Sequence, residues 1–259
     1  MRRAISLREF LGALAVGGLL CFPFSAQSAL DLNAQLIDAA KYGQSAQVSS
    51  LIAQGASVSA VDSFGYTALM WAVGHANAAT VQLLLKAGAS FPKGFDPMVA
   101  ACKGGRADIV ALLAASGRPA ADVDATGTPA VTDAALSGST ATVAALLAAG
   151  ADIDAQDASG RTALSRAAQL GMTGMVAYLL SRGASPNLYD RFGYTALLWA
   201  AHDGRSGAVD ALLRGGADIS IKGRDGLSAA KLASRRGFPQ IATAIQSHAA
   251  ASAQRGGAP

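Results

Sequence analysis

The sequence predicts an all-α solenoid, in which copies of one small helix–turn–helix unit stack on each other. Residues 190–200 read DRFGYTALLWA, and residues 62–72 read DSFGYTALMWA, a near copy. Between the copies, glycines recur every 33 residues, at 127, 160, 193 and 226. Gly-Ala pairs keep the same step, at 150–151, 183–184 and 216–217. A fixed step of this size indicates a repeat architecture, and such stacks act by presenting a long surface.

The start of one unit, residues 190–222, has the chemistry of a turn followed by a helix. Asp190 can bond to backbone two residues further on, and Gly193 accepts a positive φ. Thr195 then stands where a hydroxyl can cap the free N–H groups of a new helix.

The rest of the unit predicts two short helices. The first spans 196–203 and ends at Gly204, which can adopt the left-handed conformation. The second spans 206–214, with an apolar face of Val209, Leu212 and Leu213. Helices this short are unstable alone because nucleation is costly, so they must pack on neighbouring units. Leu180 and Leu213 are expected to be core positions, where truncation to alanine costs about 2–5 kcal/mol.

The phrase that opens each unit resembles that of ankyrin repeat proteins. The family's Thr-Pro-Leu-His-x-Ala phrase corresponds to TALMWA, TALSRA and TALLWA, which begin at Thr67, Thr162 and Thr195. Degenerate versions, DPMVAA and PAVTDA, begin at Asp96 and Pro129. The family's histidine is missing from every copy, replaced by Met70, Ser165 and Leu198 in the clearest ones, so the hydrogen bond that the resemblance implies within each repeat is in question while the fold is not. The resemblance implies stacked helix–turn–helix repeats with projecting β-hairpin loops, called fingers below.

The resemblance covers nearly the whole chain and predicts an ankyrin repeat domain at 29–248. Its expected parts are an N-cap at 30–61, repeats at about 62–91, 92–123, 124–156, 157–189 and 190–222, and a C-cap at 223–248. Seven helix pairs are expected to begin near Gln35, Ala68, Pro97, Ala130, Ala163, Ala196 and Ser228. The small, Gly-rich tail at 249–259 is expected to be disordered.

One finger is expected to be truncated. The step from Gly65 to Gly94 is 29 residues, four short of the period, and the missing residues fall at 88–94. Two interpretations stay open. In the first, the shorter finger has no consequence, because loops tolerate changes of length. In the second, the short finger leaves a notch in the row that a partner uses.

Residues 1–28 have the order of a secretory signal peptide. Three arginines precede an apolar run at 11–22, and Ala26-Gln27-Ser28 supplies small residues before a cut ahead of Ala29. The run is shorter than the roughly 20 residues that a membrane span needs. The protein is therefore expected to be periplasmic or secreted, with no stable membrane insertion after cleavage. Both the general and the twin-arginine export routes remain open.

Charge and cysteine content point away from several classes of protein. The net charge of the chain is +4. From residue 151 onward there are 12 basic and 8 acidic side chains, an excess that can steer an acidic partner to the C-terminal end. No dense basic stripe with interleaved aromatics predicts nucleic-acid binding. Cys102 is the one cysteine after residue 28, so no disulfide is expected within the processed chain; it is either a buried thiol or a redox-sensitive one.

No pattern in the sequence predicts catalysis, and we expect the protein not to be an enzyme. His75 and His202 lie four repeats apart and cannot share a compact site. No closely spaced His or Cys set has metal-ligand spacing. Nucleophile-elbow and phosphate-loop motifs are missing as well. No cofactor or metal is expected.

The expected binding site is the concave face that the family builds from finger tips and first helices. Aromatic and Arg side chains are the usual anchors of interfaces. On the aligned fingers these side chains gather toward the two ends of the row, and the predicted partner-binding residues are Phe64, Tyr66, Phe95, Arg161, Arg191, Phe192, Tyr194 and Arg224. The alternative is that each aromatic packs on its own finger, and that Trp71 and Trp199 are half-buried packing residues.

The predicted function is that of a non-catalytic protein–protein binding scaffold that acts outside the cytoplasm, as a monomer. An inhibitor or immunity-type protein that blocks one exported enzyme or toxin would use the same face, but it should carry a dominant charge complement. A receptor for a small ligand or for cell wall would need a deep pocket with convergent polar groups.

Overall fold

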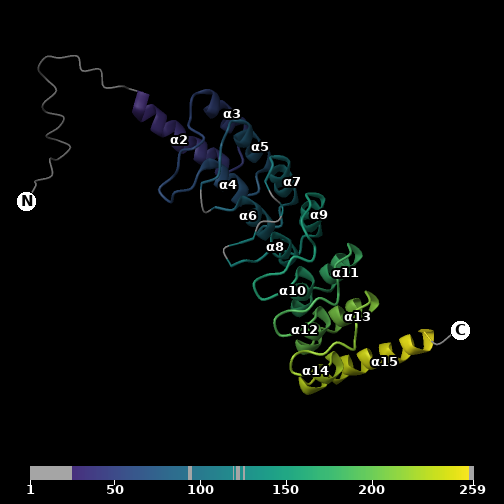
Figure 1. Cartoon of the computed structure of the whole chain (residues 1–259). Coiled ribbons are helices and arrows are strands. Elements are labelled where there is room, and N and C mark those ends of the chain that lie inside the picture. The colour runs from purple at the N-terminus through teal and green to yellow at the C-terminus, as the bar shows by residue number, and fades with distance from the viewer. Residues whose placement is uncertain (1–24, 93–94, 119, 121–122, 125, 257–259) are drawn as a thin grey trace, which may run out of the picture.

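The computed structural model describes residues 25–92, 95–118, 120, 123–124 and 126–256, which form an elongated stack of helix pairs (Figure 1). The first helices of the pairs pack on one another in chain order. They are α2 (Ser25–Lys41), α4 (Ala68–Gly74), α6 (Pro97–Lys103), α8 (Ala130–Leu136), α10 (Ala163–Leu170), α12 (Ala196–His202) and α14 (Ala229–Arg235). The second helices form a parallel row: α3 (Ser45–Ala53), α5 (Ala78–Lys86), α7 (Ala107–Ala115), α9 (Thr140–Ala148), α11 (Thr173–Ser181), α13 (Ser206–Arg214) and α15 (Pro239–Gly256). The all-α solenoid predicted from the repeat step is confirmed.

Hydroxyl and carboxylate caps explain why the first helices begin where they do. The side chains of Thr67, Thr162 and Thr195 each accept a hydrogen bond from the backbone N–H three residues further on. Asp96 caps α6 in the same way, with Pro97 in the first turn, where its missing N–H costs nothing. These caps satisfy N–H groups that a short helix leaves unpaired.

The fingers are short hairpins with very little strand. In each of four fingers the N–H of the first aspartate donates to the carbonyl four residues on, at Asp62, Asp124, Asp157 and Asp190. Adjacent fingers also touch: the N–H of Arg191 donates to the Ser159 carbonyl at 3.0 Å, and that of Arg224 to the Phe192 carbonyl at 3.0 Å. Gly160 allows this contact, because a Cβ there would lie 3.2 Å from the Asp190 Cα. The last three fingers are therefore fixed to one another.

The connection between the second and third pairs is shorter than the others. It spans 87–96, whereas the equivalent connection before α12 spans 182–195 and is four residues longer. This agrees with the truncated finger expected there. Residues 93–94, within the shortened part, lie outside the described residues.

The core is a continuous layer of leucine, valine and alanine between the two rows of helices. Val209, Leu212 and Leu213 are all buried, as expected. Leu180 is not a fully buried position. It is half-buried and packs beside Gly215, whereas its neighbour Leu179 is completely enclosed, because α11 turns that face toward the core. The Cys102 side chain is completely buried in α6.

Both ends differ from expectation. Helix α2 begins at Ser25, ten residues before the expected start near Gln35, because nothing between them breaks a helix. Helix α15 continues to Gly256, through most of the tail expected to be disordered, since its alanine run has the highest helix propensity. Cleavage ahead of Ala29 would remove the first turn of α2; residues 1–24 of the predicted signal peptide lie outside the described residues. Among the described helices, none has the length and apolarity that a membrane crossing requires.

Candidate functional site

Two fingers, four repeats apart, hold a tryptophan in the same way. In the first, one oxygen of Asp62 accepts the backbone N–H groups of Phe64 and Tyr66, each at 2.9 Å. Its other oxygen accepts the indole N–H of Trp71 at 2.8 Å. The carboxylate thus closes the finger and ties its tip to the first helix.

The second finger repeats each of these contacts. One oxygen of Asp190 accepts the N–H groups of Phe192 and Tyr194, at 2.9 and 3.0 Å. Its other oxygen accepts the indole N–H of Trp199 at 2.8 Å. The tryptophans are half-buried in both places, as the packing alternative expected.

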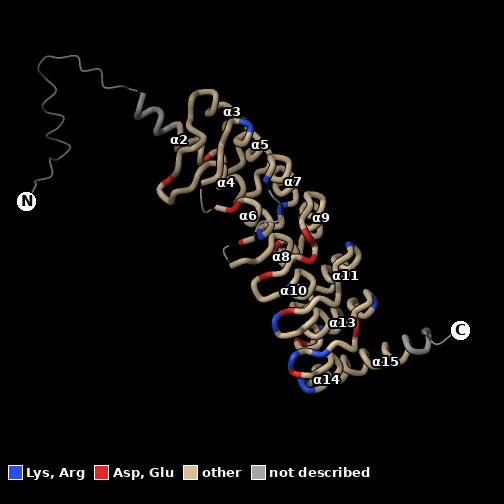
Figure 2. The backbone as a smooth tube through the Cα atoms, viewed as in Figure 1, with Lys and Arg blue, Asp and Glu red and all other residues tan. Residues whose placement is uncertain are grey.

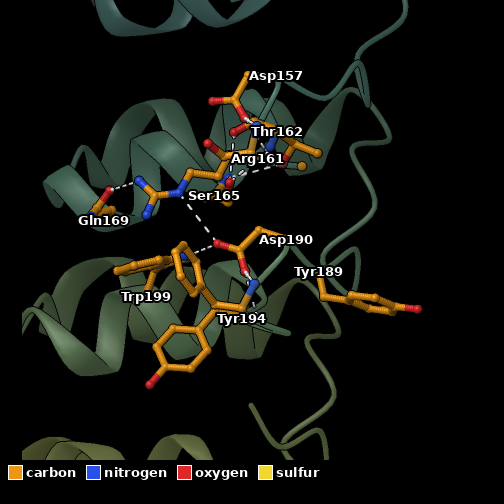
Figure 3. Close-up of polar contacts among 12 residues, drawn as sticks. Asp157, Arg161, Thr162, Ser165, Gln169, Tyr189, Asp190, Tyr194 and Trp199 are labelled. Atoms are coloured by element: carbon orange, nitrogen blue, oxygen red, sulfur yellow. Dashed lines mark hydrogen bonds and ion pairs between the residues drawn. The ribbon is translucent and has the colours of Figure 1, made fainter. Parts of the chain in front are cut away.

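A cation from the preceding repeat covers each tryptophan. The guanidinium carbon of Arg161 lies 4.1 Å from the centre of the Trp199 ring, and its Nε lies 3.5 Å from Oδ2 of Asp190 (Figure 3). The Nζ of Lys41 lies 4.9 Å from the centre of the Trp71 ring. A positive charge over an indole face is attracted by the ring quadrupole. These cations therefore join neighbouring repeats.

Arg161 consequently differs from the contact residue that the sequence predicted. Its side chain is only 15% exposed, and it also donates to Oε1 of Gln169 at 3.1 Å. The guanidinium of Arg161 therefore lies inside the stack, in contact with the Trp199 ring and the Asp190 carboxylate. Trp199 and Asp190 lie in the next repeat, so no local feature of the sequence could show that Arg161 is covered.

Several other predicted residues do lie open to solvent. The exposed fractions are 79% for Phe64, 42% for Tyr66 and 58% for Phe192. The side chains of Arg191 and Arg224 are also exposed. Phe95 is different: it is half-buried and stacks on Phe91, with ring centres 5.8 Å apart.

Tyr194 is half-buried and bonded to the following finger. Its hydroxyl donates to Oδ2 of Asp225 at 2.6 Å. Burial, together with this bond, raises the pKa of Tyr194 to about 12, so the phenol stays protonated. The same bond holds the pKa of Asp225 below its ordinary value.

A shallow hollow lies at each end of the finger row. The C-terminal hollow has a volume of about 480 Å³ and is lined by Arg191, Phe192, Tyr194, Trp199, His202, Arg224 and Asp225. The N-terminal hollow has a volume of about 380 Å³ and is lined by Ala34, Ile37, Asp38, Lys41, Val61, Asp62, Ser63, Phe64 and Trp71. The structure thus brings four of the predicted residues into one place and leaves Phe64 in the other.

Sequence reasoning missed some residues of this face. His202 and Asp225 line the C-terminal hollow, and their places follow only from the stacking of α12 on the next finger. Tyr42 and Tyr189, which line neither hollow, are strongly exposed aromatics next to a turn residue, and that is a signal that the sequence did offer. Figure 3 shows the Tyr189 side chain pointing away from Tyr194 and Trp199.

The middle of the row is polar and internally paired. Nζ of Lys103 lies 2.7 Å from Oδ2 of Asp124 and 3.8 Å from Oδ2 of Asp133. The hydrogen bond from Lys103 holds the pKa of Asp124 below its ordinary value. Burial raises the pKa of Asp133 to about 6, with Lys103 opposing the rise. Within the described residues, no group of three His, Cys, Asp or Glu side chains is placed to hold a metal ion.

Comparison with known proteins agrees with this architecture. The human ASB11 ankyrin repeat domain is 26% identical, with a TM-score of 0.69 over 81% of this chain and 96% of that one. The ankyrin repeat domain of Bcl-3, a member of the IkappaB protein family, is 30% identical, with a TM-score of 0.67 over 80% of this chain and 96% of that one. A search of curated proteins finds no significant match.

The family profile described as ankyrin repeats (3 copies) matches residues 36–127, 131–223 and 164–254, which together span most of the sequence. Ankyrin repeats are in general protein–protein interaction scaffolds, and they are typically not catalytic. The repeat step, the capped helix pairs, the fingers and these matches lead to one conclusion: this chain belongs to the ankyrin repeat family.

Proposed function

We propose that this protein is a non-catalytic scaffold that binds another protein outside the cytoplasm, through the finger face. The finger face is defined as the finger tips together with the first helices. The observation that carries the proposal is the pair of exposed aromatic fingers, at Phe64 and Phe192, each beside a hollow and each held rigid by an Asp–Trp hydrogen bond. A finger whose backbone is already held in place loses little conformational entropy on binding.

Action outside the cytoplasm rests on the signal-like order of residues 1–28. To test it, the full chain with a C-terminal tag is expressed in the source organism, the cells are fractionated, and the N-terminus is determined by mass spectrometry. We expect a product in the periplasm or medium that begins at Ala29. An intact N-terminus in the cytoplasm would refute export while leaving the binding role open.

Binding through the finger face is tested by affinity capture with the wild type and a Phe64→Ala, Phe192→Ala double variant. Both side chains are well exposed, so the variant should fold normally. Asp210→Ala, an exposed change on the second helix α13, is the matched control. We expect one protein that the wild type and the control recover and that the double variant loses, and that binds the purified scaffold directly.

Equal recovery by all three proteins would move the site away from the finger face. If the recovered partner is an enzyme or toxin whose activity falls in a one-to-one ratio with added scaffold, the inhibitor function would replace the scaffold function.

A further inference from the structure

The two aromatic fingers share one internal arrangement but differ in charge at their rims. Ser63 stands beside Phe64 at the position where Arg191 stands beside Phe192. The charged residues that line the N-terminal hollow are Asp38, Lys41 and Asp62, whereas those that line the C-terminal hollow are Arg191, Arg224 and Asp225. The two fingers therefore share one set of hydrogen bonds but have different charged side chains around them.

The walls of the C-terminal hollow are aromatic. The ring of Tyr194 lies 5.1 Å from that of Trp199, and the ring of Phe192 meets the same indole edge-on at 6.5 Å. His202 closes the other side, 5.7 Å from Trp199. The volume of about 480 Å³ falls within the range of ligand pockets, and the hollow is open to solvent through the exposed Phe192. Its aromatic lining suits an apolar side chain.

The acids around this hollow are already bonded, whereas two cations at its rim are not. Asp190 accepts three hydrogen bonds and lies beside Arg161, and Asp225 accepts the Tyr194 hydroxyl. Arg191 and Arg224 have exposed side chains, and neither forms a salt bridge within the part of the chain that the structure describes.

Further positive charge lies close by. Arg235 acts electrostatically on Asp225, and Arg236 acts on Tyr194. Figure 2 shows Lys and Arg residues gathered on the loops around α12 and α14, with fewer at the opposite end. An anionic group that approaches this end would meet an attractive field.

We propose that the C-terminal hollow binds an acidic peptide segment of a partner protein through one aromatic or leucine side chain flanked by carboxylates. The apolar side chain enters between Phe192 and the Tyr194–Trp199 pair, and the carboxylates pair with Arg191 and Arg224. Arginine is suited to this role because its planar guanidinium can bind a carboxylate with two parallel hydrogen bonds. This inference rests on the proposed function and names the chemistry of the partner.

An acidic peptide fits better than a nucleic-acid strand. Binding a strand needs a basic groove that continues along the backbone, with successive stacking platforms. Here the preceding finger has Ser159 at its tip, and the charge of Arg161 is turned inward against Asp190. The basic surface therefore ends at one finger instead of continuing along the row.

The test is selection of a random twelve-residue peptide library, displayed on phage, on the full-length protein at low salt. Enriched peptides are synthesised with a fluorescent label and titrated by anisotropy against the wild type and its variants. We expect enriched peptides that combine an aromatic residue or leucine with at least two carboxylates, and an affinity that falls as salt is added.

Three variants locate the binding site. Phe192→Ala and the double change Arg191→Ser, Arg224→Ser should each weaken binding at least about tenfold, equivalent to 1.4 kcal/mol. Phe64→Ala removes the matching aromatic at the other end and should leave the affinity unchanged. All four side chains are exposed, so circular dichroism melts should show folded proteins, which separates loss of binding from loss of structure.

Enriched peptides without an excess of acid would overturn the inference, as would binding lost in Phe64→Ala and retained in Phe192→Ala. A lack of any enriched peptide would also overturn it. So would a twelve-nucleotide single strand that binds the hollow as tightly as the best peptide. The proposed function is judged separately, by capture with each of the single variants Phe64→Ala and Phe192→Ala: a partner that requires Phe64 alone would preserve that function and reject this site.

Discussion

Replacing Asp190 by alanine should strongly destabilise the repeat at 190–222, whose finger and first helix line the C-terminal hollow. The side chain of Asp190 is only 1% exposed. Its loss leaves the N–H groups of Phe192 and Tyr194 and the indole of Trp199 without their acceptor. It also leaves the Arg161 guanidinium without the anion that lies 3.5 Å from its Nε.

The size of the effect can be worked out from these contacts. A hydrogen bond to a charged group contributes about 1.5–3 kcal/mol, but water can replace part of this for the two backbone groups at the finger. Breaking a buried ion pair by removing one partner costs about 3–5 kcal/mol. We therefore expect Asp190→Ala to lower the free energy of unfolding by about 3–5 kcal/mol. For a chain of this size, that corresponds to a fall in Tm of roughly 6–20 °C.

The assay uses the fact that the chain contains two tryptophans. In a Trp71→Phe background, the fluorescence of Trp199 reports the perturbed repeat alone, while circular dichroism reports the whole stack. Urea titrations followed by both probes separate local unfolding from global unfolding, which matters because repeat arrays need not unfold in one step. Asp62→Ala, measured in a Trp199→Phe background, is the matched control.

The control should lose less stability. Asp62 makes the same three hydrogen bonds, but it is more exposed, and its cation is Lys41 instead of the largely covered Arg161. A loss for Asp190→Ala within about 0.5 kcal/mol, the range of ordinary surface substitutions, would refute the reasoning. So would a larger loss for Asp62→Ala, because burial would then not be the deciding factor.

Three further predictions concern other parts of the stack. Burial raises the folded-state pKa of Asp133 to about 6, so ionisation of this group lowers the stability of the wild type as the pH rises from about 4 to 7. Asp133→Asn cannot ionise and should therefore gain stability relative to the wild type over that window, measured by urea titration. A difference in stability that does not change with pH would contradict the assignment. Gly160 and Gly65 have nearly equal positive φ angles, 81° and 82°. Of these two, a Cβ at 160 would meet the backbone of the next finger, whereas a Cβ at 65 would meet nothing within 4 Å. Gly160→Ala should therefore lower the Tm more than Gly65→Ala. The buried Cys102 thiol should react with Ellman's reagent slowly in the native protein and rapidly in urea, whereas fast native labelling would show that α6 opens readily.

Most of the architecture was accessible from the sequence, because ankyrin repeats are specified by local chemistry repeated at a fixed step. The helix starts at Ala68, Pro97, Ala130, Ala163 and Ala196 were all predicted, and the range 206–214 matches α13. Each follows from a cap or a turn residue within a few positions of the helix. The two ends were predicted less well, since nothing outside the repeat pattern marks where α2 begins or where the alanine-rich α15 stops.

The candidate site depended on contacts that no local pattern contains. The sequence predicted Phe64 and Phe192 as partner-binding residues because they are aromatic and stand at finger tips, and both side chains are exposed. It could not show that Arg161 is covered by the next repeat, nor that His202 and Asp225 complete a hollow with Tyr194. Local sequence therefore determined the repeating unit, whereas stacking of successive units decided which charges are used internally and which remain available to a partner.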